Sequence, residues 1–162
     1  MYERFRKQFM RILTAYFSAS KTTEALAKSL AEHTGSLLFE IVPKVPYSSA
    51  DLNYMNPLAR CNREMVMKKN VPIVSKVSDM ESYDLIFLGF PIWYYGAPLI
   101  IQSFLKEYDL SGKKLALFAT SGGSDIGKTA EKLKPFTEGE IIAAEVFRDS
   151  ISLNAWADEL LK

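Results

Sequence analysis

The stretch "RILTAYFSASKTTEALAKSL" (residues 11–30) decides the fold prediction, because an apolar run passes directly into a helical pattern. Residues 11–17 have the composition of a buried strand, and the spacing of apolar side chains predicts a helix from residue 22 to 33. Gly35 is placed to end that helix. Between strand and helix, with no glycine and no acid among them, stand the hydroxyl side chains of Ser18, Ser20, Thr22 and Thr23.

The same alternation continues along the chain. Strands are expected at residues 36–42, 84–90, 114–120 and 141–147, and helices from Pro98, over 126–134 and from about residue 150. Residues 43–82 contain four prolines and predict long irregular connections with a short helix after Pro57. The sequence therefore predicts an α/β fold in three layers, with a doubly wound five-stranded parallel sheet in the order 2-1-3-4-5.

Length and composition fit one globular domain and exclude several classes of protein. The chain has 162 residues and a formal net charge of +1, which gives no support to nucleic-acid binding. Cys61 is the only cysteine, so no intramolecular disulfide and no multi-thiolate metal site is possible, and a reducing cytoplasm is expected.

Two segments resemble targeting or membrane signals but fit other structures better. The uncharged apolar run at residues 12–17 is too short for a signal peptide. Residues 85–105 carry no charge and are long enough to cross a bilayer. Glycines and prolines interrupt that run in its middle, so we expect a strand, a turn and a helix rather than a membrane span.

Three loops carry unusual residues, namely 18–23, 91–98 and 120–127. Strands 1, 3 and 4 are neighbours in a sheet of the order 2-1-3-4-5, so these loops converge where such sheets bind ligands. The amides and hydroxyls at the start of the first helix suit a phosphate, although Thr22 or Ser20 could equally act as a helix cap. Flat rings at residues 93–95 suit stacking on a heterocycle, although Tyr95 could equally pack against a helix.

Glycines complete the pattern. Gly96, Gly122 and Gly123 could let the backbone approach a ligand or expose its amides, or could simply form tight turns. A phosphate site, an aromatic platform and a set of backbone donors together indicate a mononucleotide with a planar head.

Residues 10–134 resemble the flavodoxin family, particularly its bacterial flavodoxin-like branch. The resemblance is carried in order by "ILTAYFSASKTTEALAKSL", "DMESYDLIFLGFPIWYYGAP" and "FATSGGSDIGKT". It implies non-covalent binding of FMN, and a division into an N-terminal extension (1–9) and a flavodoxin-like domain (10–162). The cofactor-binding residues that it implies are Ser18, Ala19, Ser20, Lys21, Thr22, Thr23, Pro91, Ile92, Trp93, Tyr94, Gly96, Thr120, Ser121, Gly122 and Gly123.

The chain departs from the family in three ways. Lys21-Thr22 stands where many relatives have Gly-Asn, so the lysine must tolerate the backbone angles of the loop. Residues 120–127 contain no aromatic side chain, whereas long-studied flavodoxins sandwich the flavin between two rings. The near-neutral chain also lacks the acidic docking surface of many carrier flavodoxins.

Two functions remain open. The first is an electron carrier whose chemistry belongs to FMN, which the lack of an obvious acid or base favours. The second is an FMN-dependent reductase that takes hydride from NAD(P)H and reduces a quinone or similar acceptor, which the missing second aromatic favours. Expected partners are a redox protein or a small electron acceptor, and the chain is expected to be a monomer or homodimer without nucleic acid or membrane. Loop 43–60 could cover the flavin through Tyr47 or Tyr54.

Overall fold

The computed structural model describes residues 10–68, 70–74 and 76–162, and its centre is a parallel sheet of five strands. The strands lie in the order β2-β1-β3-β4-β5, which confirms the predicted fold. Their bounds are β1 Ile12–Tyr16, β2 Leu37–Glu40, β3 Leu85–Pro91, β4 Lys114–Thr120 and β5 Glu140–Val146. The proposed extension at residues 1–9 lies outside the described residues.

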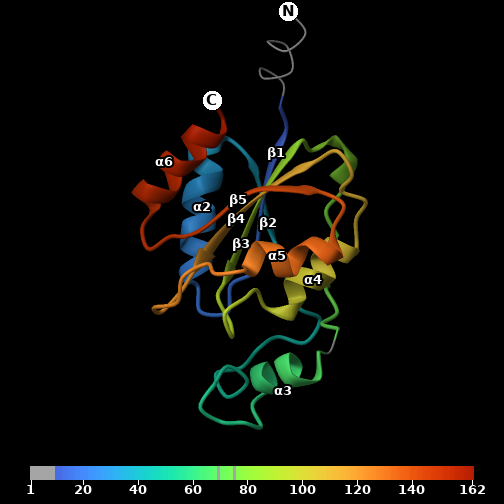
Figure 1. Ribbon diagram of the computed structural model, residues 1–162, viewed down its shortest axis with the longest axis vertical. Coiled ribbons are helices and arrows are strands. Elements are labelled where there is room, and N and C mark those ends of the chain that lie inside the picture. Colours follow the sequence, from blue (N-terminus) through green and yellow to red (C-terminus); the bar gives the residue numbers. More distant parts are fainter. Residues whose placement is uncertain (1–9, 69, 75) are drawn as a thin grey trace, which may run out of the picture.

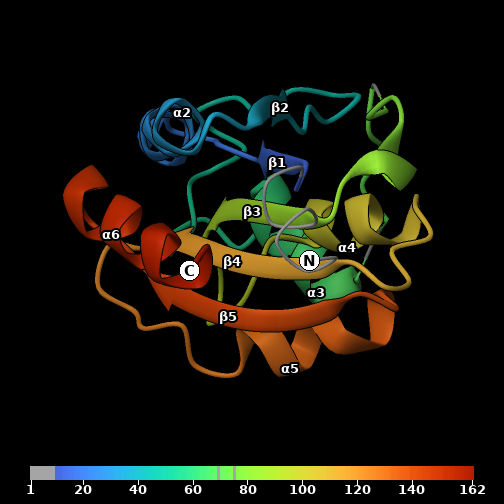
Figure 2. The same cartoon turned by 90° about the horizontal axis from the view of Figure 1, so that it is seen from above.

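Helices cover both faces of the sheet (Figures 1 and 2). On one face α2 (Thr22–Thr34) packs beside α6 (Ser150–Leu160), and on the other lie α4 (Leu99–Lys106) and α5 (Thr129–Leu133). Helix α3 (Arg60–Met67) lies apart from these layers, beyond the carboxyl ends of the strands (Figure 1). Two short 3₁₀ turns occupy Met80–Ser82 and Lys134–Phe136.

The alternation of side chains along β3 divides the core between the two faces. Leu85 and Phe87 join the hydrophobic cluster that includes α2 and α6, whereas Ile86 and Leu88 join the cluster that includes α4. Both sets are buried, as expected for a parallel strand with helices on each side. Gly89 is required at its position, because an added Cβ would lie 2.2 Å from Cζ of Phe118.

Element ends differ from the predictions where local hydrogen bonds compete. Gly35 ends α2 in a left-handed conformation with φ of 67°, as predicted. The helix expected at 126–134 begins only at Thr129, because a preceding turn bonds the N–H of Thr129 to the carbonyl of Ile126 over 3.1 Å. Pro135 ends the α-helical hydrogen bonding, but the chain turns once more as a 3₁₀ helix. Among the described residues, none of the helices has the length and apolar character that crossing a membrane requires.

Candidate functional site

The loop after β1 is held by one of its own hydroxyls. Oγ of Ser18 accepts the N–H of Glu24 over 3.1 Å and so caps the first turn of α2. Lys21 precedes that turn in a left-handed conformation with φ of 68°. The lysine thus takes backbone angles that are more usual for the glycine found here in many relatives. Ser20 and Thr22 are exposed, and the structure records no cap from either side chain. Their hydroxyls therefore stay accessible beside the helix N-terminus.

A buried hydroxyl pair joins the first turn of α2 to the end of β4. Oγ1 of Thr23 and Oγ1 of Thr120 lie 2.7 Å apart, and both side chains are buried. Thr120 is the last residue of β4, and its carbonyl accepts the N–H of Ile92 over 2.8 Å. The ends of β1, β3 and β4 are thus bonded to one another, as the predicted convergence of the three loops requires.

The loop after β3 forms a tight two-residue turn. Trp93 and Gly96 exchange backbone hydrogen bonds of 2.8 and 3.1 Å, and Tyr94 and Tyr95 between them have φ of 53° and 63°. Positive φ at both central residues is typical of a type I′ turn, which normally contains Asn or Gly. The left-handed positions are therefore occupied by the two tyrosines rather than by Gly96. Nζ of Lys132 donates to the carbonyl of Tyr95 over 3.3 Å and supports the turn.

Trp93 is fixed by other rings. Phe17 meets its ring edge-to-face at 5.6 Å between centroids, and Tyr47 does so at 5.5 Å. Phe17 and Tyr47 also contact one another at 5.8 Å. Tyr47 therefore packs against Trp93, and the flavin contact considered for it in the sequence stays a prediction.

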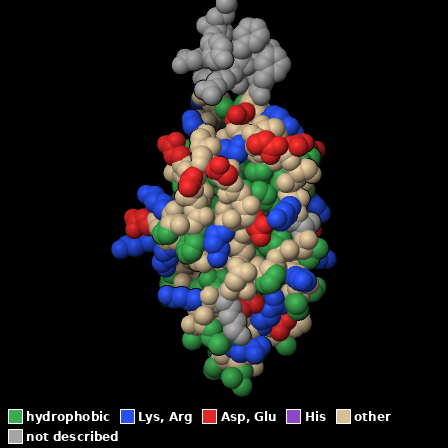
Figure 3. Space-filling model, turned by 90° about the vertical axis from the view of Figure 1, so that its right-hand side faces the viewer, with side chains coloured by type: hydrophobic (Ala, Val, Ile, Leu, Met, Phe, Trp, Pro, Cys, Tyr) green, Lys and Arg blue, Asp and Glu red, His purple; other side chains and the backbone are tan. Residues whose placement is uncertain are grey.

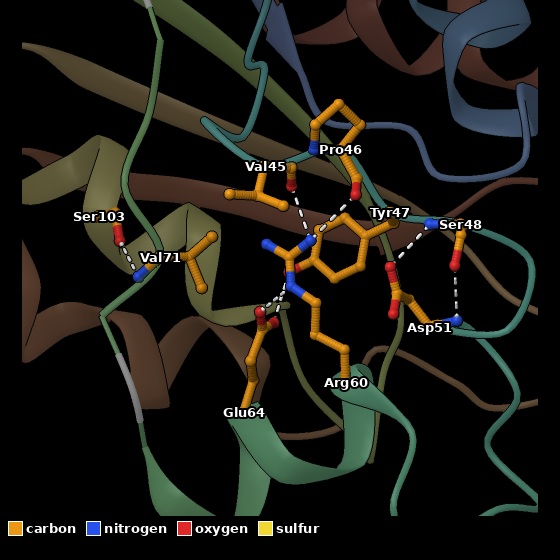
Figure 4. Close-up of polar contacts among 9 residues, drawn as sticks. All are labelled: Val45, Pro46, Tyr47, Ser48, Asp51, Arg60, Glu64, Val71 and Ser103. Carbon is orange, nitrogen blue, oxygen red and sulfur yellow. Dashed lines mark hydrogen bonds and ion pairs between the residues drawn. The ribbon is translucent and has the colours of Figure 1, made fainter.

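Tyr47 belongs to an arm, described at residues 44–68 and 70–72, that leaves the sheet after β2 and includes α3. The arm is closed at its base, where the N–H of Lys44 donates to the carbonyl of Pro72 over 2.8 Å. The N–H of Val71 also donates to Oγ of Ser103 in α4 over 3.3 Å (Figure 4). The two ends of the arm are thus bonded to each other, and its second end is also bonded to α4.

A partly buried charged network holds the inner side of the arm (Figure 4). Nε of Arg60 donates to Glu64 over 2.7 Å, and Nη1 donates to the carbonyls of both Val45 and Pro46, at 2.6 and 3.1 Å. The guanidinium also lies over the ring of Tyr47, 4.0 Å from the centroid, while the Tyr47 hydroxyl donates to Glu64. Burial, followed by the bond to Glu64, raises the pKa of Tyr47 well above its ordinary value.

These segments surround one cleft of about 650 Å³, within the range of small-molecule sites. Three predicted loops and the arm line it: Ala19, Ser20, Leu52, Tyr54, Cys61, Pro91, Ile92, Trp93, Tyr94, Tyr95, Ser121, Gly122, Gly123 and Ser124. An added Cβ at Gly122 or Gly123 would meet no atom within 4 Å, so these glycines leave open space along one wall. A planar ring can occupy such a space next to the aromatic turn.

The structure brings most of the predicted site residues to this cleft. Ser18, Thr23 and Thr120 lie behind the wall and hold the loops in place, whereas Lys21 and Thr22 are exposed at the start of α2. Sequence reasoning did not include the arm residues Leu52 and Cys61. Oη of Tyr94 lies 4.0 Å from Sγ of Cys61, and burial, then the neighbouring thiol, raises the pKa of Tyr94 to about 12. The Tyr94 phenol is thus neutral at physiological pH.

The cleft lies at the switch point of a doubly wound sheet and combines three features: a helix N-terminus suited to a phosphate, an aromatic turn and a glycine-lined wall. These features define a mononucleotide-binding class of α/β protein. Sequence comparison specifies the family. A sequence model of the flavodoxins matches residues 11–159, which is nearly all of the described chain. The chain belongs to the flavodoxin family, as the resemblance predicted, and FMN is the cofactor that this membership brings with it.

Solved structures show the same relationship. A protein from Bacteroides eggerthii DSM 20697, designated a flavoprotein, is 39% identical, with a TM-score of 0.84 over 94% of this chain and 98% of that one. A Lactobacillus acidophilus NCFM flavoprotein solved with FMN has a TM-score of 0.68 at 22% identity, over 91% of this chain and 99% of that one, and shows the fold.

Curated relatives match a shorter segment. Flavodoxin 1 of Escherichia coli (strain K12) is 42% identical over 55 residues, which are 32% of this chain and 31% of that protein. The chain therefore matches about a third of the length of these relatives.

Proposed function

We propose that the protein binds FMN in the cleft and transfers electrons between redox partners. The main support for this proposal is one cleft of about 650 Å³, around which the α2 N-terminus, the aromatic turn and the glycine wall converge. FMN accepts and releases electrons, and the chain supplies its binding and its electrostatic surroundings. Similarity to flavoproteins along nearly the whole chain, one of them 39% identical, supports the same assignment.

The residues fit each part of the cofactor. The exposed hydroxyls of Ser20 and Thr22 and the free end of α2 suit the phosphate, and the charge of Lys21 adds attraction. Trp93 and Tyr94 suit one face of the flavin ring, and the wall at 121–124 leaves room beside it. The partners on this proposal are a redox protein or a small electron acceptor, and the single unpaired cysteine suits a cytoplasmic location.

An FMN titration of the desalted full-length chain tests the proposal. The expected result is a bound flavin with quenched fluorescence and a perturbed visible spectrum. Gly122→Leu is expected to weaken FMN binding by about tenfold or more, because its side chain fills the open wall, without lowering the free energy of unfolding. The matched control is Lys134→Leu, an exposed residue at the other edge of the sheet, which should bind FMN normally. Failure of the parent chain to retain FMN would refute the proposal.

One observation favours reductase activity as the second candidate. The wall at 121–124 is built from serine and glycine alone, so a nicotinamide could stack where carriers of this family have a second ring. Anaerobic addition of NADPH and then NADH to the FMN-loaded chain separates the candidates. Prompt loss of the flavin band indicates hydride transfer, and an unchanged spectrum indicates a carrier that needs a partner.

A further inference from the structure

Large hydrophobic side chains are exposed mainly on one part of the molecule. Of the eleven such side chains among the described residues, nine lie between Val45 and Tyr95, on or beside the arm, and only Leu37 and Ile151 lie elsewhere. The nine are Val45, Tyr54, Met55, Leu58, Val66, Met67, Val74, Tyr94 and Tyr95. Figure 3 shows hydrophobic side chains at the lower end of the molecule, where Figure 1 places the loop before α3.

Three of these exposed side chains are held on the loop before α3. Tyr54, Met55 and Leu58 are 74%, 76% and 77% exposed. The buried amide of Asn62 donates to the carbonyls of Tyr54 and Asn56 over 3.1 and 2.6 Å, which fixes the loop against α3. A fixed apolar surface binds with less loss of conformational entropy than a flexible one. Tyrosine and methionine are also enriched at protein interfaces.

The patch is continuous with the rim of the cleft. Tyr54, Tyr94 and Tyr95 are exposed and also line the cleft. A partner that covers these rings therefore lies next to whatever the cleft binds, which is what electron transfer between proteins requires.

Charge is distributed unevenly between the two edges of the sheet. The described loops that leave the carboxyl ends of the strands, together with α3 and its C-cap residue Lys68, carry seven basic and four acidic side chains. These are Lys21, Lys44, Arg60, Arg63, Lys68, Lys128 and Arg148, against Asp51, Glu64, Asp125 and Asp149. The described segments that enter the strands carry four basic and six acidic ones, namely Arg11, Lys76, Lys113 and Lys134, against Asp79, Glu81, Asp84, Glu107, Asp109 and Glu138. Acidic side chains accordingly gather in the upper part of Figure 3.

We propose that the exposed hydrophobic side chains of the arm and the basic side chains around them form the docking surface for an acidic electron-transfer protein. This inference rests on the proposed function. A basic surface attracts an acidic partner and orients it with its redox centre toward the cleft. A second copy of the chain is disfavoured as the occupant, because a two-fold interface would place two identical basic surfaces against each other.

Binding to two redox proteins of opposite charge tests the inference. A fluorescently labelled plant-type [2Fe–2S] ferredoxin, which is acidic, and labelled mitochondrial cytochrome c, which is basic, are titrated with the full chain in excess FMN. Anisotropy is expected to show ferredoxin binding that weakens about tenfold or more between about 20 mM and about 500 mM salt. Stronger binding of cytochrome c at low salt, or no ferredoxin binding there, would overturn the inference.

Matched charge reversals locate the surface. Arg63→Glu with Lys68→Glu, both exposed on α3 or its end, should weaken ferredoxin binding about tenfold. Lys114→Glu with Lys134→Glu makes the same change of charge at the other edge and should alter binding less than about twofold. Equal effects of the two pairs would contradict the proposed location.

Separate measurements test the exposed hydrophobic side chains of the surface and the alternative that a second copy of the chain binds there. Leu58→Ser should weaken ferredoxin binding about tenfold with no loss of stability, because the side chain is 77% exposed. A parent chain that sediments as a dimer and becomes a monomer on Leu58→Ser would overturn the inference in favour of self-association. Retention of FMN after desalting is measured separately on the same samples, so a failed FMN site is distinguished from a failed docking surface.

Discussion

The Arg60–Glu64 network supports the strongest prediction about stability. Their side chains are only 17% and 11% exposed, so the pair lies largely out of water. Arg60→Met removes the cation and leaves the Glu64 carboxylate with the Tyr47 hydroxyl alone, while the carbonyls of Val45 and Pro46 lose their donor. Breaking a buried pair on one side costs about 3–5 kcal/mol. Because water reaches part of both side chains, we expect about 3 kcal/mol.

Hydrogen exchange measured residue by residue shows where this loss falls. The arm is anchored to the domain at its base and through Tyr47, so it can open without unfolding of the sheet. Exchange of the α3 amides should accelerate about a hundredfold, since each 1.4 kcal/mol is about a factor of ten. Amides of β3 should change far less.

Two further variants make the reasoning refutable. Arg63→Met, on the same helix but exposed, should leave exchange within about twofold of the parent. The double variant Arg60→Met with Glu64→Leu should recover most of the loss, because a hydrophobic pair of similar volume replaces the charges. Exchange in Arg60→Met as slow as in the parent, or a double variant as unstable as the sum of its parts, would refute the assigned role.

Three other predictions follow from single positions. Gly89→Ala should lower the free energy of unfolding in urea by about 3 kcal/mol, because its Cβ would lie 2.2 Å from the ring of Phe118, and an unchanged midpoint would contradict the packing. Lys21→Gly should raise the free energy of unfolding by about 0.5–1 kcal/mol by relieving a residue at φ of 68°, whereas Lys28→Gly within α2 should lower it by about 1 kcal/mol. The pKa of Tyr47 is higher in the folded chain than its ordinary 10.0. The protonated Tyr47 hydroxyl therefore contributes fully to the free energy of unfolding below pH 10.0, and this contribution is lost as the pH rises further. Urea unfolding between about pH 9 and about pH 11 should therefore show a smaller alkaline loss in Tyr47→Phe than in the parent.

The sheet and its three loops were predictable because their signals are local. Unbroken apolar runs such as residues 85–90 identify central parallel strands, and Gly35 marks the end of α2. Strand order then follows from the family of doubly wound sheets, and it places the three loops together without knowledge of any side-chain contact.

The cleft wall contributed by the arm was not predictable in the same way. Leu52 and Cys61 reach the cleft on the arm, which is held by the packing of Tyr47 on Trp93 and by the bonds of Tyr47 and Arg60 to Glu64. The spacing of Arg60 and Glu64 at i and i+4 is visible in the sequence, but solvent-exposed helices show the same spacing. Their burial depends on contacts with residues far away in the chain.

The aromatic turn shows a second limit of sequence reasoning. Glycine takes the left-handed conformation more readily than any other residue, yet Tyr94 and Tyr95 take it in this turn and Gly96 does not. The hydrogen bonds between Trp93 and Gly96 fix both ends of the turn, and only two intervening residues remain to reverse the chain. Closure of the turn therefore outweighs the preference of tyrosine for negative φ. The conformational preferences of single residues do not predict this outcome.

The arm gives the cleft and the proposed docking surface a common support. Tyr47 contacts Trp93 in the cleft wall and is held by Glu64 on α3, and the same helix holds the loop of Tyr54 through Asn62. A partner seated on this loop would press on the elements that position the aromatic wall. Arg60→Met should consequently weaken both FMN and ferredoxin binding, whereas Leu58→Ser should weaken only ferredoxin binding. Loss of FMN affinity in Leu58→Ser would show that the exposed tip contributes to the cofactor site itself and not to docking alone.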